Sequence, residues 1–186
     1  MSEDRFLFIK APSPVECIEI GLSEKGVFSV KLLRIKGKLP PEICRKEDEY
    51  IRSFFDNYFA CNSAGFSANL DLRGSEFEKK VWLEIMKIPY GFNATYGMLA
   101  ERVGSPGGAR AVGQACGKNP LPIIVPCHRV VSSTGIGGFA LGVELKKHLI
   151  NLEGRAKERS RVQRQLLLHL PEEKQKAEPS VEHSSS

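Results

Sequence analysis

Hydrophobic and polar residues alternate along two runs near the start of the chain, with a turn signal between them. In residues 15–22 and 27–35 apolar and polar side chains largely alternate, and a polar, glycine-containing stretch at 23–26 separates the two runs. Period-two alternation is typical of half-buried strands, so this pattern predicts a β-hairpin. A shorter alternation at 66–72 predicts one more strand.

The period becomes helical in the segments that follow. Aromatic and aliphatic residues recur every three or four positions at 46–60 and again at 76–88, which predicts two amphipathic helices. We interpret the aromatic stripe of the first helix as core without chemistry. Ser75 and Thr95 are typical N-cap residues, and Thr95 precedes a third, short helical pattern at 96–103.

Two further helices are predicted in the second half of the chain. One spans residues 105–116, because a proline follows its first residue and proline fits the first position of a helix. Together with the helix at 96–103 and the turn at Gly104, it forms a candidate helix-turn-helix, which by itself is a weak signal for DNA binding. The last helix is predicted at 143–152, ending at Glu153-Gly154.

These patterns predict three regions. We expect an α/β domain at 1–70, a mainly helical domain at 71–154 and a charged, flexible tail at 155–186. Three prolines between positions 120 and 126 rule out a regular central strand, so we interpret 120–131 as a stiff, buried connector that fixes the position of Cys127.

Composition narrows the class of protein. The chain has 186 residues, 41% of them hydrophobic, which is enough for a buried core, and it has no apolar run of the ~20 residues that a membrane span needs. Its five cysteines include no closely spaced pair, which argues against a disulfide framework or a zinc ribbon. The formal net charge of +5 arises after residue 70 and weakly favours a polyanionic partner.

The candidate chemistry lies at Cys127-His128. A cysteine is a good nucleophile only as a thiolate, and a neighbouring histidine can take its proton directly or through a water molecule. Adjacency alone, however, is explained more simply by a buried core cysteine beside a histidine whose hydrogen bonds are satisfied.

Several motifs around this pair change that interpretation. They are, in chain order, Thr95-Tyr96, Arg110-Ala111-Val112-Gly113, Asn119-Pro120, Pro126-Cys127-His128-Arg129-Val130, Gly135 to Gly138 and Glu153-Gly154. Together, from about Phe77 to Gly154, they closely resemble the O6-alkylguanine-DNA alkyltransferase family, also called methylated-DNA–protein-cysteine methyltransferases.

The resemblance implies DNA repair by direct, stoichiometric and irreversible transfer of an alkyl group, typically methyl, from O6-alkylguanine to Cys127, with O4-alkylthymine as a further substrate. The damaged nucleotide would be flipped out of double-stranded DNA by a monomer that enters the minor groove. No cofactor is implied. It also implies a ribonuclease-H-like sheet with a helix at 1–70, and a helix-turn-helix at 71–154. The expected compartment is the cytoplasm of a prokaryote or the nucleus of a eukaryote, without a membrane partner.

The resemblance also implies catalytic roles for particular residues. Cys127 would accept the alkyl group, His128 would act as its base through a water molecule, and Glu153 would orient His128. Asn119 would brace the turn that carries Cys127, and Tyr96 would donate a proton to the departing guanine.

Further positions would bind DNA or the guanine. Arg110 would fill the gap left by the flipped nucleotide. The other implied DNA contacts are Thr95, Tyr96, Ser105, Ala109, Ala111, Gly113 and Gln114. The implied guanine pocket consists of Tyr96, Val130, Phe139, Ala140 and Leu141, with the backbone carbonyls of Cys127 and Val130 contacting the base.

Two departures from the family pattern affect these expectations. The pocket loop often resembles Tyr-Ser-Gly-Gly in this family but is Phe139-Ala140-Leu141-Gly142 here, so bulky inhibitors should be tolerated less well. Some members bind zinc in the N-terminal domain, but Cys17, Cys44 and Cys61 do not reproduce a ligand set, and we predict no metal.

Three alternatives compete with this interpretation. Alkyltransferase-like proteins only flag damage, but they lack the acceptor cysteine. A cysteine hydrolase would assemble its nucleophile and base from distant segments rather than from neighbours. A transcription regulator would need a further domain, for which 155–186 offers little room.

Overall fold

The N-terminal part is built on a three-stranded antiparallel sheet. The computed structural model describes residues 4–34, 48–62 and 65–168. Strands β1 (Arg5–Lys10), β2 (Cys17–Ser23) and β3 (Gly26–Leu33) pair in the order β1-β2-β3. The predicted hairpin is confirmed as β2–β3. Strand β1 was not predicted, because Phe6 and Phe8 interrupt its alternation with Leu7 and Ile9.

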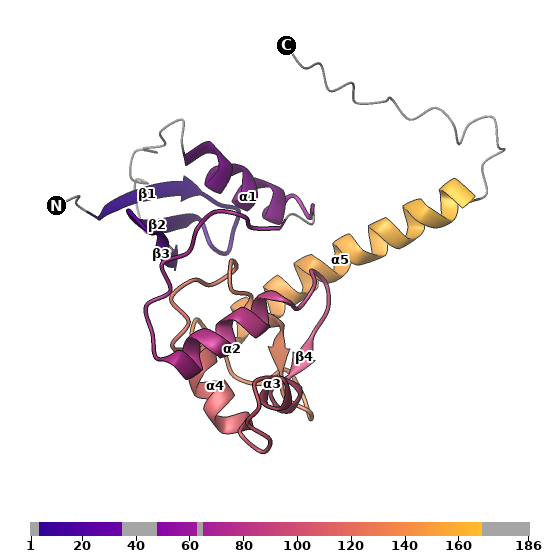
Figure 1. Cartoon of the computed structure of the whole chain (residues 1–186). Helices are drawn as coiled ribbons and strands as arrows, with labels where there is room; N and C mark the ends of the chain where they lie inside the picture. The colour runs from indigo at the N-terminus through magenta and orange to yellow at the C-terminus, as the bar shows by residue number, and fades with distance from the viewer. Residues whose placement is uncertain (1–3, 35–47, 63–64, 169–186) are drawn as a thin grey trace, which may run out of the picture.

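Helix α1 (Glu49–Phe59) lies alongside this sheet (Figure 1) and confirms the predicted amphipathic helix. Its buried residues are Ile51, Phe54, Phe55 and Tyr58. The strand predicted at 66–72 is wrong. In residues 66–72, Leu70 alone forms a β-bridge, an isolated one with Val27 of β3. The segment makes only two backbone hydrogen bonds to the sheet, both with Val27, which is too few for a strand.

Helix α2 (Glu76–Met86) begins at the predicted cap. The Ser75 hydroxyl accepts a hydrogen bond from the Glu78 backbone N–H, and the Glu78 carboxylate accepts one from the Ser75 N–H, so a capping box closes the first turn. The indole of Trp82 is buried and donates to the Ala115 carbonyl at 2.8 Å, which joins α2 to the later helix α4.

Helices α3 (Tyr96–Arg102) and α4 (Ala109–Gly117) are separated by a turn. Thr95 caps α3 as predicted, since its hydroxyl accepts from the Met98 N–H at 3.2 Å. The prediction that the second of these helices begins at residue 105 is wrong. Gly107 has a φ of 78°, which a right-handed helix cannot include, so α4 begins only after Gly108.

The segment before and after Cys127 is a buried connector, as predicted. Residues 121–130 are all buried, and the Pro120 carbonyl accepts a hydrogen bond from Val30 at the edge of the sheet at 2.8 Å. The connector ends in the one-turn 3-10 helix η2 (Cys127–Arg129) and strand β5 (Val130–Val131), which pairs in parallel with β4 (Ala94–Thr95).

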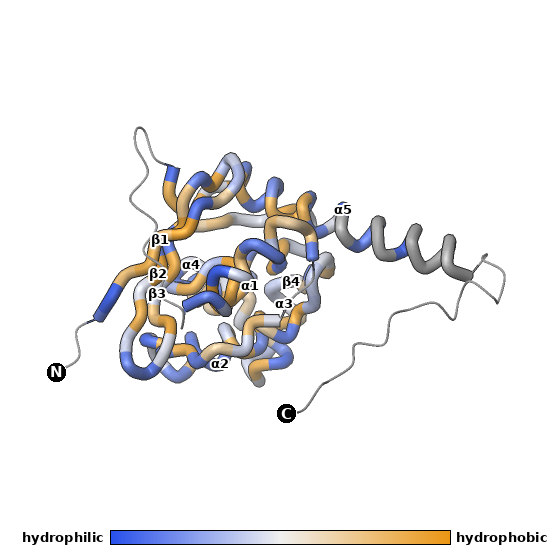
Figure 2. Tube along the Cα trace, turned by 90° about the horizontal axis from the view of Figure 1, so that it is seen from above, coloured by the Kyte–Doolittle hydropathy of each residue, from blue (hydrophilic) through white to orange (hydrophobic). Residues whose placement is uncertain are grey.

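Helix α5 (Val143–Leu168) continues well past its predicted end and projects from the rest of the chain (Figures 1 and 2). The prediction that it stops at Glu153-Gly154 is wrong, and 155–168 is helical instead of a flexible tail. One interior glycine costs a helix only about 1 kcal/mol, which good helix formers on either side can offset. Residues 169–186 lie outside the described ranges.

One continuous cluster of buried apolar residues links the sheet, α1, the connector and the later helices. Hydrophobic segments of the tube in Figure 2 accordingly run through both halves of the chain. Within 4–34, 48–62 and 65–168, no helix is long and apolar enough to cross a membrane.

Candidate active site

Cys127 lies at the start of η2 and lines a pocket of about 600 Å³. Its side chain is held by Asn119, whose amide nitrogen lies 3.0 Å from Sγ of Cys127 and 2.8 Å from the Val125 carbonyl. The amide oxygen of Asn119 accepts from the Leu121 N–H at 2.9 Å. Asn119 therefore braces the connector and contacts the thiol with the same side chain.

The thiol of Cys127 is only 6% exposed, and this controls its protonation. Burial raises its pKa, while the hydrogen bond from Asn119 and the positive charge of Lys146 oppose that rise without cancelling it. The group is consequently a thiol rather than a thiolate at neutral pH. Nucleophilic reaction therefore needs a base beside it.

His128, the next residue in the chain, is buried and neutral, as such a base must be. Its ring is fully buried, and Nε2 lies 2.7 Å from Oε1 of Glu153, an ionised carboxylate that requires the proton on Nε2. In the part of the chain that the structure describes, Nδ1 of His128 is the one buried side-chain nitrogen or oxygen without a protein hydrogen-bond partner. Burial lowers the pKa of His128 despite Glu153, so the imidazole is neutral with an unoccupied lone pair.

The carboxylate of Glu153 accepts hydrogen bonds on both oxygens. Oε1 accepts from His128, from the Tyr58 hydroxyl at 2.9 Å and from Nη2 of Arg129 at 3.0 Å. Oε2 accepts from Nε of Arg129 and from the Gly91 N–H, both at 2.9 Å. Burial alone would raise the pKa of Glu153, but the hydrogen bonds from His128 and Arg129 and the charge of Arg129 bring it to about 2.

Tyr58 is a site residue that sequence reasoning missed. It lies on α1, in the aromatic stripe interpreted as core, and its hydroxyl is also 3.3 Å from Nε2 of His128. Burial, and then the charge of Glu153, raise its pKa well above the usual value, so the hydroxyl stays protonated. A polar tip within an apolar stripe was the available signal, because a buried tyrosine hydroxyl needs a partner.

Lys146 on α5 was also missed. Its ammonium group is buried and donates to the Val130 carbonyl at 2.6 Å and to the Gly138 carbonyl at 2.9 Å, and it lies 5.7 Å from the ring centroid of Tyr96. Lys146 thereby links strand β5, the loop that contains Gly138 and the ring of Tyr96. A lysine in the first turns of a helix is ordinarily solvated, so no sequence pattern pointed to Lys146.

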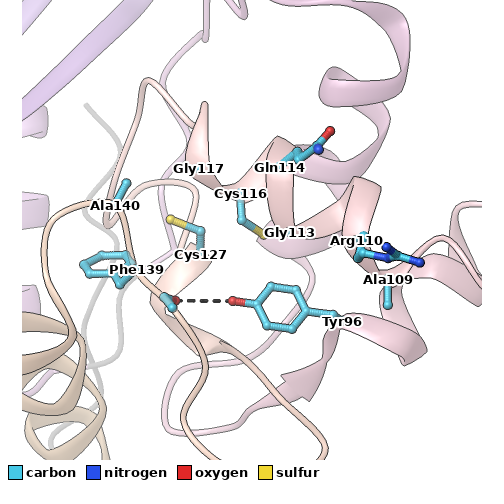
Figure 3. Close-up of a pocket in the computed structure, with 11 residues that line it drawn as sticks. Tyr96, Ala109, Arg110, Gly113, Gln114, Cys116, Gly117, Cys127, Phe139 and Ala140 are labelled. Atoms are coloured by element: carbon cyan, nitrogen blue, oxygen red, sulfur yellow. Dashed lines mark hydrogen bonds between the residues drawn. The ribbon is translucent and has the colours of Figure 1, made fainter.

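Tyr96 enters the pocket from the start of α3 (Figure 3). Its hydroxyl donates to the Gly138 carbonyl at 3.3 Å, shown as the dashed line in Figure 3. Burial raises its pKa, so it remains a proton donor. Cys116 of α4, which was not predicted as a site residue, lines the same pocket.

The predicted guanine pocket is only partly reproduced. Phe139 and Ala140 line the same pocket as Cys127, but Leu141 does not. The Gly142 N–H donates to the Phe139 carbonyl and turns the chain, so Leu141 is 43% exposed and lines a separate depression. Val130 is fully buried, and its carbonyl accepts from a lysine. Leu141 therefore gives no reason to expect that bulky inhibitors are tolerated less well.

The predicted DNA-contact residues gather at the α3–α4 side of the pocket. Ala109, Arg110, Gly113 and Gln114 line its rim from α4, and Arg110 points away from Cys127 (Figure 3). No hydrogen bond or ion pair to Arg110 occurs among the described residues. The remaining predicted contacts lie nearby: Ala111 is exposed on α4, Thr95 caps α3, and Ser105 lies in the turn between the helices.

Of the cysteines considered as possible zinc ligands, those that the structure describes do not line the Cys127 pocket. Cys17 is buried in β2, Cys61 follows α1, and Cys44 lies outside the described residues. Among the described side chains, no group of three or more histidine, cysteine, aspartate or glutamate residues could hold a metal ion.

A buried thiol held by an amide, followed in the chain by a neutral imidazole with a free lone pair, is the set of groups that a protein with a cysteine nucleophile requires. Residues 76–155 match the family model described as 6-O-methylguanine DNA methyltransferase, DNA binding domain. A methylated-DNA–protein-cysteine methyltransferase of Methanosarcina acetivorans is 38% identical over 147 residues, covering 76% of this chain and 94% of the relative.

Two further comparisons agree. A protein of the same name from Mycolicibacterium paratuberculosis is 50% identical over 99 residues, covering 53% of this chain and 60% of the relative. The crystal structure of Mycobacterium tuberculosis OGT in complex with DNA is similar with a TM-score of 0.69 and 31% identity, covering 81% of this chain and 93% of that one. The chain belongs to the methylated-DNA–protein-cysteine methyltransferase family.

Proposed function

We propose that Cys127 is the acceptor through which this chain, as a member of its family, removes the alkyl group of O6-alkylguanine from DNA. The observation that carries the proposal is the arrangement of one pocket-lining thiol, one amide that holds it and one adjacent imidazole with a free nitrogen. O4-alkylthymine is a second substrate to be tested.

The reaction is an in-line displacement at the alkyl carbon. Nδ1 of His128 takes the Cys127 proton through a water molecule, while the sulfur–carbon bond forms and the carbon–O6 bond breaks. Glu153 stabilises the imidazolium that results. The Tyr96 hydroxyl gives a proton to the departing guanine and is left as a phenolate. The proton taken up by His128 then returns through water to Tyr96, so the net change moves the thiol proton to the guanine. The thioether that remains cannot be cleaved by these groups, and each molecule therefore acts once.

DNA recognition is proposed for the helices beside the pocket. We assign α3, the turn and α4 as a helix-turn-helix whose small-residue face, with Ala109, Ala111 and Gly113, enters the minor groove. The unpaired guanidinium of Arg110 occupies the gap left when the damaged nucleotide is flipped into the pocket. Thr95, Ser105 and Gln114 contact the backbone or the groove.

The organisation of the whole chain follows the same family. We propose that residues 1–70 form a ribonuclease-H-like domain, that 71–154 form the DNA-binding and acceptor domain, and that the protein acts as a monomer. A DNA substrate places it in the cytoplasm of a prokaryote or the nucleus of a eukaryote. The small sheet with α1 and the mainly helical second part support the two domain assignments.

Intact-mass measurement after incubation with DNA containing O6-methylguanine tests the function. We expect each molecule to gain the mass of one CH2 unit, located on Cys127 by peptide mapping, and no further gain with excess DNA. Cys127→Ser should gain nothing. Cys61→Ser is the matched control, because this thiol lies outside the pocket and should not affect transfer. An unmodified wild-type protein, or a modified Cys127→Ser variant, would contradict the proposal.

A further inference from the structure

Tyr58, in the aromatic stripe of α1, contacts the buried carboxylate of Glu153. Tyr58 is buried, and its hydroxyl donates to Oε1 of Glu153, the oxygen that also accepts from Nε2 of His128. Tyr58 and Glu153 are 95 positions apart in the sequence. The matched family domain spans residues 76–155 and so does not include Tyr58.

We propose that Tyr58 is a positioning residue for alkyl transfer: its hydroxyl fixes the Glu153 carboxylate, and through it the ring of His128. The N-terminal part of the chain thus completes the catalytic base. This inference rests on the proposed role of His128 as the base for Cys127.

The hydrogen bonds on the two carboxylate oxygens support this role. Oε2 of Glu153 is held by the Gly91 backbone and by Nε of Arg129, so that side of the carboxylate is fixed already. Oε1 lies 2.7 Å from Nε2 of His128, and among the described residues its other two hydrogen bonds come from Tyr58 and Nη2 of Arg129. The hydroxyl of Tyr58 therefore supplies one of two bonds that aim Oε1 at the imidazole.

Tyr58 is itself held rigidly. Its ring meets those of Phe59, Tyr90 and His128 edge to face, with centroids 5.2, 5.6 and 6.3 Å away. The Tyr90 hydroxyl donates to the Tyr58 carbonyl at 3.2 Å. A donor whose ring and backbone are both fixed can orient an acceptor without losing side-chain freedom during the reaction.

The charge of the donor matters as well. Arg129 already neutralises the Glu153 carboxylate, and a second cation would weaken its stabilisation of the imidazolium that forms on His128. A neutral hydroxyl positions the carboxylate while leaving more of its charge available to His128. Since its pKa is raised by burial and by Glu153, Tyr58 remains a donor throughout.

Tyr58→Phe removes the hydroxyl and keeps the ring. We expect the maximal rate of methyl transfer at saturating DNA to fall on the order of tenfold, because one hydrogen bond to a charged group corresponds to roughly that factor. The DNA concentration giving half-maximal rate should not change, since the hydroxyl lies behind the pocket. Tyr50→Phe is the matched control: this hydroxyl, on the same helix, bonds to Gly65 and Ser67, away from Glu153.

A double-mutant cycle distinguishes positioning from a general structural effect. If Tyr58 acts through Glu153, Tyr58→Phe should change the rate less than twofold in a Glu153→Gln background. An equal loss in both backgrounds, or an unchanged rate for Tyr58→Phe in the otherwise intact protein, overturns the inference. Neither result affects the proposed function, which fails only if the intact protein does not methylate Cys127.

Discussion

The charge of Glu153 holds the buried network together, and Glu153→Gln removes that charge while nearly preserving shape. Both carboxylate oxygens accept hydrogen bonds, from four residues in all. A glutamine offers one oxygen, and its NH2 group would face at least one donor. Arg129, which is itself buried, would also lose its counterion.

The lowered pKa of Glu153 and its burial as an ion pair predict a similar loss of stability for Glu153→Gln. The pKa of Glu153 is about 2 in the folded protein against a usual 4.5. At 1.36 kcal/mol for each pH unit between those values, the ionised carboxylate contributes about 3 kcal/mol to folding. Removing one partner of a buried ion pair costs roughly 3–5 kcal/mol, which agrees. Because the folded pKa is the lower one, this stability is complete above about pH 4.5 and disappears as the pH falls towards 2.

Urea unfolding of the intact protein and Glu153→Gln at a series of pH values measures this. We expect a difference in unfolding free energy of about 3 kcal/mol at pH 7 that shrinks steadily below pH 4.5. Glu144→Gln is a control on the same helix, because its carboxylate is exposed and pairs only with Lys147. A difference below 1 kcal/mol at pH 7, or one that does not change with pH, would refute the reasoning.

Three further substitutions test other parts of the structure. Asn119→Ala should slow methyl transfer about tenfold, because the Cys127 thiol loses the hydrogen bond that opposes the rise in its pKa. In single-turnover measurements across a pH series, the rise of the rate with pH should shift to higher pH. Tyr96→Phe should slow transfer roughly a hundredfold with little change in DNA affinity, measured by the same assay and by titration, whereas equal losses in both would contradict a proton donor. Ser75→Ala should lower the unfolding free energy by about 1 kcal/mol and leave transfer unchanged, since only the capping box is lost.

Local features of the fold could be read from the sequence. Ser75 and Thr95 act as caps where they were expected, and the hairpin around residues 23–26 forms, because each depends on neighbours a few positions away. Helix ends were predicted less well, because a proline or glycine that favours a helix end can be outweighed by its neighbours. Pro106 does not begin α4, and Gly154 does not end α5.

The candidate site shows the same division. Cys127, His128, Asn119 and Glu153 were all identified from motifs. The structure places Asn119 against the Cys127 thiol and Glu153 against the His128 ring. Leu141 was placed in the pocket by its position in a motif, but the turn at 139–142 directs it elsewhere.

The sequence by itself indicated the candidate nucleophile, the candidate base beside it, the family and the short-range elements that carry them, because these depend on residue type and close spacing. Only the tertiary structure decided which distant groups complete the site. Tyr58 and Lys146 belong to helices whose patterns indicate core and surface, yet folding buries their polar ends against Glu153 and the Val130 carbonyl. Burial makes every such group require a partner, and partners separated by many residues are chosen by packing rather than by local sequence.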